Sequence, residues 1–211
     1  MKEINNSNES LMKSKEKYIR IIYLPAVTVA EINFYGESLL PGEEIYLSDE
    51  KVKETDTEKI MRNHFDAGLN AIDKLIKDNK ITEIKADFRL YGFANCSKME
   101  EYGPFYGFGR WLTIPNDMDV PYPFVKKRFN GGLYCAYNRP LPFSGGDSDE
   151  WEVLNHWICN NDKYEYDGGR GEPICNYGLL EEYLNYINRY NLPLNDRLQQ
   201  TDLIMPIKEK K

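Results

Sequence analysis

The sequence predicts an α+β fold made of two β-α-β-β units that are related by pseudo-twofold symmetry. A strand, a loop, a helix and two further strands are indicated over about residues 18–116, and the same order recurs over about residues 122–208. Short stretches of the halves also align, since a shift of 105 places Leu24 on Phe129 and LPAVTVAEIN on FNGGLYCAYN. An internal repeat of this kind predicts two similar structural units.

In the first half, residues 18–36 are dense in β-branched and aromatic side chains, and Pro25 interrupts them. This pattern predicts two strand pieces that are joined by a bend. After a loop, apolar residues recur at steps of three and four over residues 55–76, which predicts a helix. Residues 85–95 and 106–115 are predicted to form two strands, and the turn-forming stretch PNDMDVPYP then connects the halves.

In the second half, residues 124–138 are predicted to form a strand that bends at its central Gly-Gly pair. Acidic residues followed by an apolar stripe from Trp151 to Ile158 predict a helix. The segments 178–185 and 201–207 are predicted to be the last two strands. A shift of 91, which places Pro115 on Pro206, relates the last strands of the two halves.

Residues 1–16 are polar and aperiodic, so we expect a flexible leader without a role in the core. Residues 17–211 are then expected to form a single domain. The leader has no apolar central region, and no apolar run approaches the ~20 residues of a membrane span. We therefore expect a cytoplasmic protein without a membrane partner.

Composition narrows the function classes. The formal net charge is −7 and no helix-turn-helix segment is recognisable, so direct binding of nucleic acid, which requires a basic surface, is not expected. Aromatic residues make up 13% of the chain and include 16 tyrosines. Two interpretations stay open: the tyrosines cover half-exposed strands, or their rings line a pocket.

The cysteines and histidines indicate neither a metal nor a cofactor. Four cysteines occur without a Cys-x-x-Cys pair, and the two histidines add no zinc-ligand spacing. We expect free thiols of a reducing compartment, no metal site and no cofactor.

Several segments from about residue 19 to residue 208 together point to one family. They are IIYLPAVTVA, LYGFAN, WLTIPNDMDVP, KKRFNGGLY, EWEVLNHWI with NDKYEYDG, LLEEYLN and LIMPIKE. In their order and wording they resemble the GyrI-like effector-binding domains, the ligand-sensing modules of some AraC-type and MerR-type transcription regulators. The resemblance implies a fold like the C-terminal domain of Rob, with antiparallel sheets flanking a central ligand cleft. It also implies a hydrophobic, often cationic ligand and, in some members, a carboxylate deep in the cleft.

The resemblance further implies which residues bind the ligand. The family's Glu-x-Tyr strand pattern falls on Glu181 and Tyr183, and strand alternation places Glu182 on the other face. We expect Glu181 to face the cleft; the alternative is a half-exposed strand residue without a special role. A shift of 90 sets Tyr91 against Glu181 and Phe93 against Tyr183, so the opposite wall is expected to be aromatic.

Two further aromatic residues are candidates for the cleft. Trp111 matches the aromatic residue before the family's T-[IV]-P hinge, with core packing as the alternative. Tyr134 alternates opposite Cys135 and is a secondary candidate. Gly109 and Arg110 stand where the family commonly has Tyr-Glu, and a cation near the cleft is expected to weaken the preference for cationic ligands and to permit anionic or zwitterionic ones.

We therefore expect a standalone effector-binding protein that holds a small hydrophobic or aromatic ligand, cations included, in a transcription-related or drug-sequestering role. Such a protein would act on a separate regulator or by sequestration. Two alternatives stay open. One is a small-molecule hydrolase in which Glu181 acts as acid or base and Tyr183 orients it. The other is a module of the gyrase-inhibitor kind that binds a topoisomerase.

Overall fold

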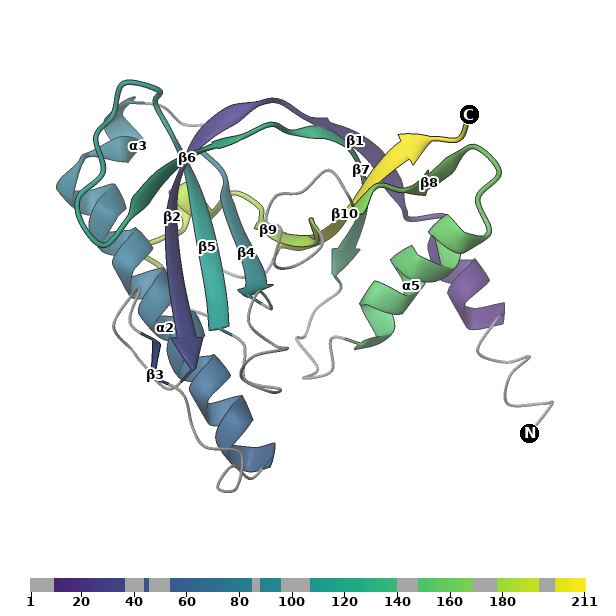
Figure 1. Cartoon of the computed structure of the whole chain (residues 1–211), viewed down its shortest axis with the longest axis horizontal. Coiled ribbons are helices and arrows are strands. Elements are labelled where there is room, and N and C mark those ends of the chain that lie inside the picture. Colours follow the sequence, from purple (N-terminus) through teal and green to yellow (C-terminus); the bar gives the residue numbers. More distant parts are fainter. Residues whose placement is uncertain are drawn as a thin grey trace.

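A computed structural model describes residues 10–36, 44–45, 54–84, 88–95, 107–139, 148–168, 178–193 and 200–211. These residues build an α+β structure around one strongly curled, ten-stranded sheet (Figure 1). The strands are β1 (Arg20–Leu24), β2 (Val27–Gly36), β3 (Glu44–Ile45), β4 (Leu90–Asn95), β5 (Gly107–Ile114), β6 (Val125–Phe129), β7 (Gly132–Arg139), β8 (Tyr164–Tyr166), β9 (Leu180–Tyr183) and β10 (Thr201–Glu209). The helices are α2 (Glu54–Asp78), α3 (Ile81–Ile84) and α5 (Ser148–Cys159), with a short 3-10 turn η3 (Tyr186–Asn188).

The order of the strands confirms the predicted pair of β-α-β-β units. The central strands run β7-β10-β9-β4-β5-β2, so each half supplies three neighbours and the halves meet where β9 pairs with β4. The pairs are antiparallel except for the short parallel pair of β2 and β3. The two halves therefore share one continuous curled sheet.

Both predicted bends are present, and they exchange strand pieces between the halves. β1 ends at Leu24 before β2 begins at Val27, and β6 ends at Phe129 before β7 begins at Gly132. These positions differ by the predicted shift of 105. β1 pairs with β7 of the second half, whereas β6 pairs with β2 of the first half. Each half thus borrows an edge strand from the other.

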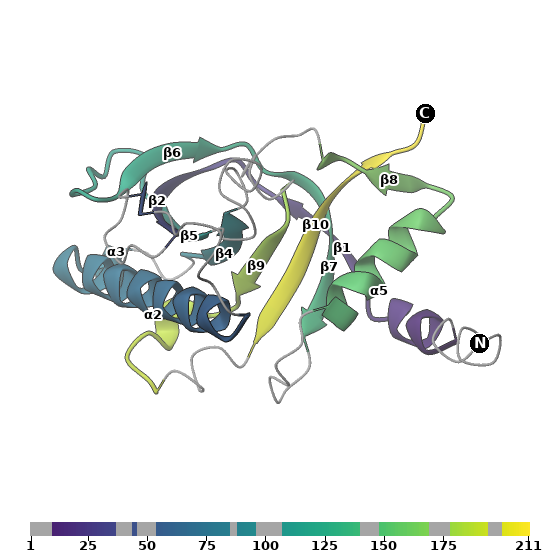
Figure 2. The same cartoon turned by 60° about the horizontal axis from the view of Figure 1, so that its bottom comes forward.

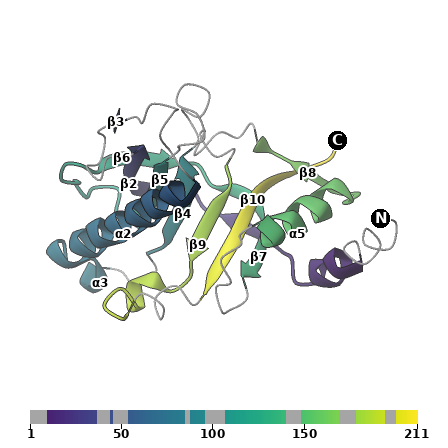
Figure 3. The same ribbon diagram turned by 90° about the horizontal axis from the view of Figure 1, so that it is seen from below.

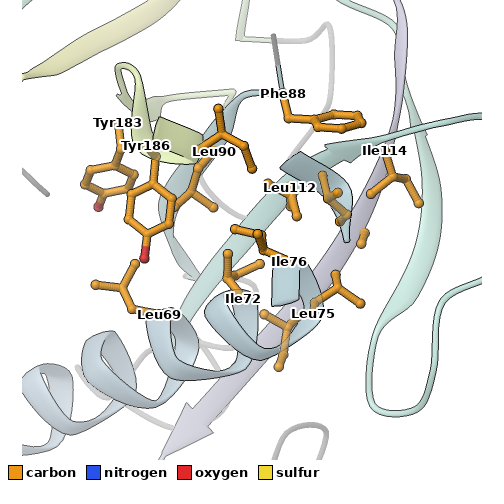
Figure 4. Close-up of a cluster of buried hydrophobic side chains, with 14 of the residues drawn as sticks. Leu69, Ile72, Leu75, Ile76, Phe88, Leu90, Leu112, Ile114, Tyr183 and Tyr186 are labelled. Atoms are coloured by element: carbon orange, nitrogen blue, oxygen red, sulfur yellow. The ribbon is translucent and has the colours of Figure 1, made fainter. Parts of the chain in front are cut away.

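The helices cover one face of the sheet. Figures 2 and 3 show α2 beside the β2, β5 and β4 half and α5 beside β7 and β10. The periodicity that predicts α2 is explained by its buried stripe, in which Leu69, Ile72 and Ile76 pack on Ile32 and Leu112 of the sheet (Figure 4). Leu154 and Ile158 of α5 pack likewise on Leu203 and Ile207 of β10.

The leader differs from its prediction. Residues 10–16 form a helix, and the expectation of a flexible segment is wrong for them. Met12 packs against the α5 cluster, and Glu16 Oε1 lies 2.5 Å from Nδ1 of His156 on α5. One apolar residue and one carboxylate are enough to dock this short turn. Residues 1–9 lie outside the described part, and the single domain over residues 17–211 stays a prediction.

None of the helices in the described part of the chain is both long and apolar enough to cross a membrane.

Candidate functional site

The two faces of the curled sheet carry different side chains. One face packs on α2 and α5, as described above. The other face carries a separate buried cluster, which we call the aromatic face. Its members are Leu24, Val29, Tyr91, Phe93, Trp111, Phe129, Tyr134, Ala136, Leu180 and Ile204.

The rings of the aromatic face are in mutual contact. The centroid of Trp111 lies 5.1 Å from that of Phe93 and 5.3 Å from that of Phe129. Phe129 in turn lies 6.0 Å from Tyr91 and 6.3 Å from Tyr134. The structure thus brings together four of the six residues expected for the ligand site. It adds Phe129, which the sequence indicated only as the apolar end of a basic strand.

Glu31 lies at the centre of this face, although the sequence did not single it out. The indole Nε1 of Trp111 donates a hydrogen bond to Glu31 Oε2 at 2.6 Å, and Asn33 Nδ2 donates to Oε1 at 2.8 Å. Lys127 Nζ lies 2.5 Å from the same Oε1. Glu31 is 5% exposed, so its charge is held by these three donors and orients the indole ring.

Two more carboxylates lie on the aromatic face, side by side on β9 and β10. Glu182 is the cross-strand partner of both Tyr91 and Asp202. Its Oε1 lies 2.6 Å from Nε of Arg89, whereas its Oε2 is buried and has no hydrogen-bond partner among the described residues. Asp202 is held by Arg20 at 2.5 Å. Asn138 Nδ2 donates a second bond to Asp202, at 2.9 Å. Burial raises the pKa of Glu182, Asp202 raises it further, and Arg89 opposes both effects.

The pairing of β4 with β9 corrects the expected position of Glu181. Glu181 is the cross-strand partner of Gly92, and Gly92 is the partner of Arg110, so all three lie on the helix side. The Tyr183 hydroxyl donates to Glu181 Oε2 at 2.6 Å. Figure 4 shows Tyr183 in the core cluster above α2. The predicted alternation holds, but the prediction that Glu181 projects into the ring-lined site is wrong.

The physical reason is a slip of one residue between the repeats. An even shift of 90 places Tyr91 on Glu181, and in a strand one residue moves a side chain to the other face. The shift of 91 that places Pro115 on Pro206 places Tyr91 on Glu182 instead, and these two residues do share a face. The acidic residue of the aromatic wall is therefore Glu182.

Arg110 also lies away from the aromatic face. Its Cζ is 4.2 Å from the ring centroid of Phe65, 4.8 Å from that of Phe108 and 5.1 Å from that of Tyr183. The guanidinium is fully buried against α2, where its Nη2 donates to the Phe65 carbonyl at 3.3 Å. The expectation of a cation near the ligand cleft is thus wrong, and with it the reason to doubt a cationic ligand.

The described residues offer no alternative chemistry based on thiols or metals. Cys135 is buried on the α5 side, its Sγ lies 3.6 Å from the Met205 carbonyl, and burial raises its pKa to about 12. Its thiol therefore stays protonated and unreactive. Within the described ranges no three His, Cys, Asp or Glu side chains come together to hold a metal ion. Cys96 and Cys175 lie outside these ranges.

The raised pKa of Glu182 gives a testable dependence on pH. A carboxyl whose pKa is higher in the folded than in the unfolded protein binds protons more tightly when folded, so its contribution to stability grows as the pH falls. Between about pH 8 and about pH 5, the free energy of unfolding of the wild type should rise relative to that of Glu182→Gln. Urea titrations at several pH values measure this difference. A difference that falls with decreasing pH would contradict the assignment of Glu182 as a desolvated acid.

Comparisons with known proteins identify relatives of this fold. The family of integron-associated effector binding proteins, Cass2, matches residues 20–207. The C-terminal domain of EcmrR is similar with a TM-score of 0.50 and 10% identity, covering 91% of this chain and 98% of that one. EcmrR in a DNA complex gives a TM-score of 0.51 and 11% identity, covering 99% of this chain and 68% of that one. SAV2435 bound to tetraphenylphosphonium gives 0.45 and 8% identity, covering 90% and 93%. No curated protein shows a significant match.

Proposed function

This chain belongs to the family of integron-associated effector binding proteins, and on that premise we propose that it binds a small hydrophobic ligand, preferably a cationic aromatic one, at the aromatic face. The observation that carries the proposal is Glu182. Its Oε2 is buried next to Tyr91 and has no partner among the described residues. A desolvated carboxylate oxygen without a donor is unfavourable, and an organic cation at that oxygen removes the penalty.

The surrounding rings favour the same ligand. A cation over an aromatic face gains about 0.5–2 kcal/mol for each well-placed ring. Tyr91 lies beside Glu182, and Trp111 is in turn the cross-strand partner of Tyr91. Because the rings contact one another, a ligand that enters has to separate them and replace ring–ring contacts by its own. Such an exchange makes few demands on ligand shape, so we propose broad specificity for flat or globular aromatic cations.

We propose binding without turnover. The hydrolase alternative requires Glu181 and Tyr183 at the ligand, but both side chains lie on the helix side, where Tyr183 is buried under α2. A role in sensing for transcription regulation or in sequestering a drug-like compound follows from the effector-binding family and stays part of this proposal. A protein partner, whether a separate regulator or a topoisomerase, stays a prediction.

Two neighbouring residues provide a matched test. We expect Glu182→Gln to weaken binding of tetraphenylphosphonium at least about tenfold, or about 1.4 kcal/mol, because the ligand loses its counter-charge. Glu181→Gln makes the same chemical change on the other face and is expected to keep the affinity within about twofold. Isothermal titration calorimetry measures both, with neutral triphenylphosphine oxide as a second ligand that should not distinguish wild type from Glu182→Gln. Loss of affinity in Glu181→Gln alone would overturn the placement of the site.

A further inference from the structure

All three carboxylates of the aromatic face have the same arrangement of counter-charge. Glu31, Glu182 and Asp202 are nearly fully buried. Each is paired with one basic side chain that keeps a large part of its surface in water: Lys127 is 43% exposed, Arg89 36% and Arg20 50%. The acid of each pair is therefore fixed inside, whereas the base reaches in from outside.

Such a pair is asymmetric in the cost of breaking it. A buried carboxylate without a partner is strongly unfavourable, whereas an exposed guanidinium that swings away is rehydrated. Any cation that reaches the carboxylate can therefore replace the basic side chain at little cost to that side chain. The pairing chemistry is the same for a guanidinium and for an organic cation, so the two compete for the same oxygens.

Among the three pairs, the one of Glu182 is the most open to exchange. Both oxygens of Glu31 have donors, and so do both oxygens of Asp202. Glu182 is held through Oε1 alone, by Nε of Arg89 at 2.6 Å. The backbone of Arg89 is fixed independently, because its amide donates to Thr113 Oγ1 at 2.7 Å. The side chain can thus leave without disturbing the strand that carries Tyr91.

We propose that Arg89 is a displaceable internal counter-ion that competes with cationic ligands for Glu182 and thereby sets the affinity and charge selectivity of the site. This inference rests on the proposed function and names the residue that tunes it. In the absence of ligand Arg89 neutralises the buried acid; a cationic ligand takes over that role, and Arg89 moves to solvent. A neutral ligand cannot replace the guanidinium and so does not compete with it. Arg89 is therefore a specificity-determining residue.

The test is the direction of the change in affinity. Arg89→Met is expected to bind tetraphenylphosphonium about tenfold more tightly than the wild type, because the ligand becomes the sole counter-charge of Glu182. The titrations are run at about pH 8.5, where Glu182 is ionised beside Asp202, Tyr91 and Arg20. Affinity for triphenylphosphine oxide should stay within about twofold. A merely structural arginine predicts the opposite, since losing it would loosen the site and weaken both ligands.

Arg128→Met is the matched control, because it removes the same charge from an exposed residue whose hydrogen bond, at 3.4 Å, goes to the Asn116 amide oxygen. It should leave both affinities unchanged. In the double variant Arg89→Met/Glu182→Gln the gain should disappear. Arg89→Gln replaces Arg89→Met if the latter does not give a folded circular dichroism spectrum. Equal or weaker binding of the cation by a folded Arg89 variant, with Glu182-dependent binding by the wild type, overturns this inference alone. No binding by any variant overturns the proposed function and this inference together.

Discussion

Trp111→Ala is expected to lower the free energy of unfolding by about 4 kcal/mol, the largest effect of any single side chain on the aromatic face. The indole is fully buried and touches the rings of Phe93 and Phe129, so its removal leaves a cavity between the halves of the ring cluster. It also removes the Nε1 donor of Glu31 Oε2, and a buried carboxylate oxygen without that donor adds about 1–3 kcal/mol of cost. Packing and hydrogen bonding act in the same direction here.

Trp111→Phe separates the two contributions, because it keeps most of the ring volume and loses only the donor. We expect this variant to lose about 1–3 kcal/mol. Equilibrium urea denaturation followed by far-UV circular dichroism measures both variants. Equal losses for alanine and phenylalanine would show that the hydrogen bond to Glu31 dominates, and a loss below about 1 kcal/mol for alanine would contradict the burial of the indole.

The elements and the fold class could be predicted because their signals are local. The stripe of α2 and the bends at Pro25 and Gly131 all follow from residue types at short spacing, and the structure contains each of them. The resemblance to the GyrI-like domains is confirmed by the family match over residues 20–207. The exchange of β1 and β6 between the halves was not predicted, because pairing between distant strands leaves no trace in the local pattern of either strand.

The candidate site was predicted only in part, for a reason that concerns single residues. Tyr91 and Trp111 were found because large aromatic residues in strands stand out whatever the register. The choice between Glu181 and Glu182 depended on a shift of one residue, and the family pattern favoured the wrong one. Glu31 offered a signal that was not used: an acidic residue inside the apolar stretch VTVAEINF must face a partner if the strand is buried on both sides. Asp202 within TDLIMPI offered the same signal.

Gly131→Ala is the second change for which we expect a large effect, a loss of about 3 kcal/mol or more in the free energy of unfolding. Gly131 has φ 67°, in the left-handed region that favours glycine. An added Cβ would lie 2.1 Å from the Leu24 carbonyl oxygen and 2.7 Å from the backbone of Pro25. These contacts are with backbone atoms, which cannot turn aside as a flexible side chain can.

The position of this contact in the repeat connects stability with the site. The bend after Phe129 meets the bend after Leu24, and these are equivalent bends of the two halves. Phe129 and Leu24 both belong to the aromatic face, so forcing the bends apart also moves two side chains of the proposed site. Asn130→Ala changes the exposed neighbouring residue and should cost less than about 0.5 kcal/mol. Denaturation midpoints of the two variants test the contact, and calorimetry with tetraphenylphosphonium tests its consequence. A Gly131→Ala protein as stable as Asn130→Ala would show that the two bends are not in contact, whereas a destabilised protein with unchanged affinity would separate the crossing of the strands from the ligand site.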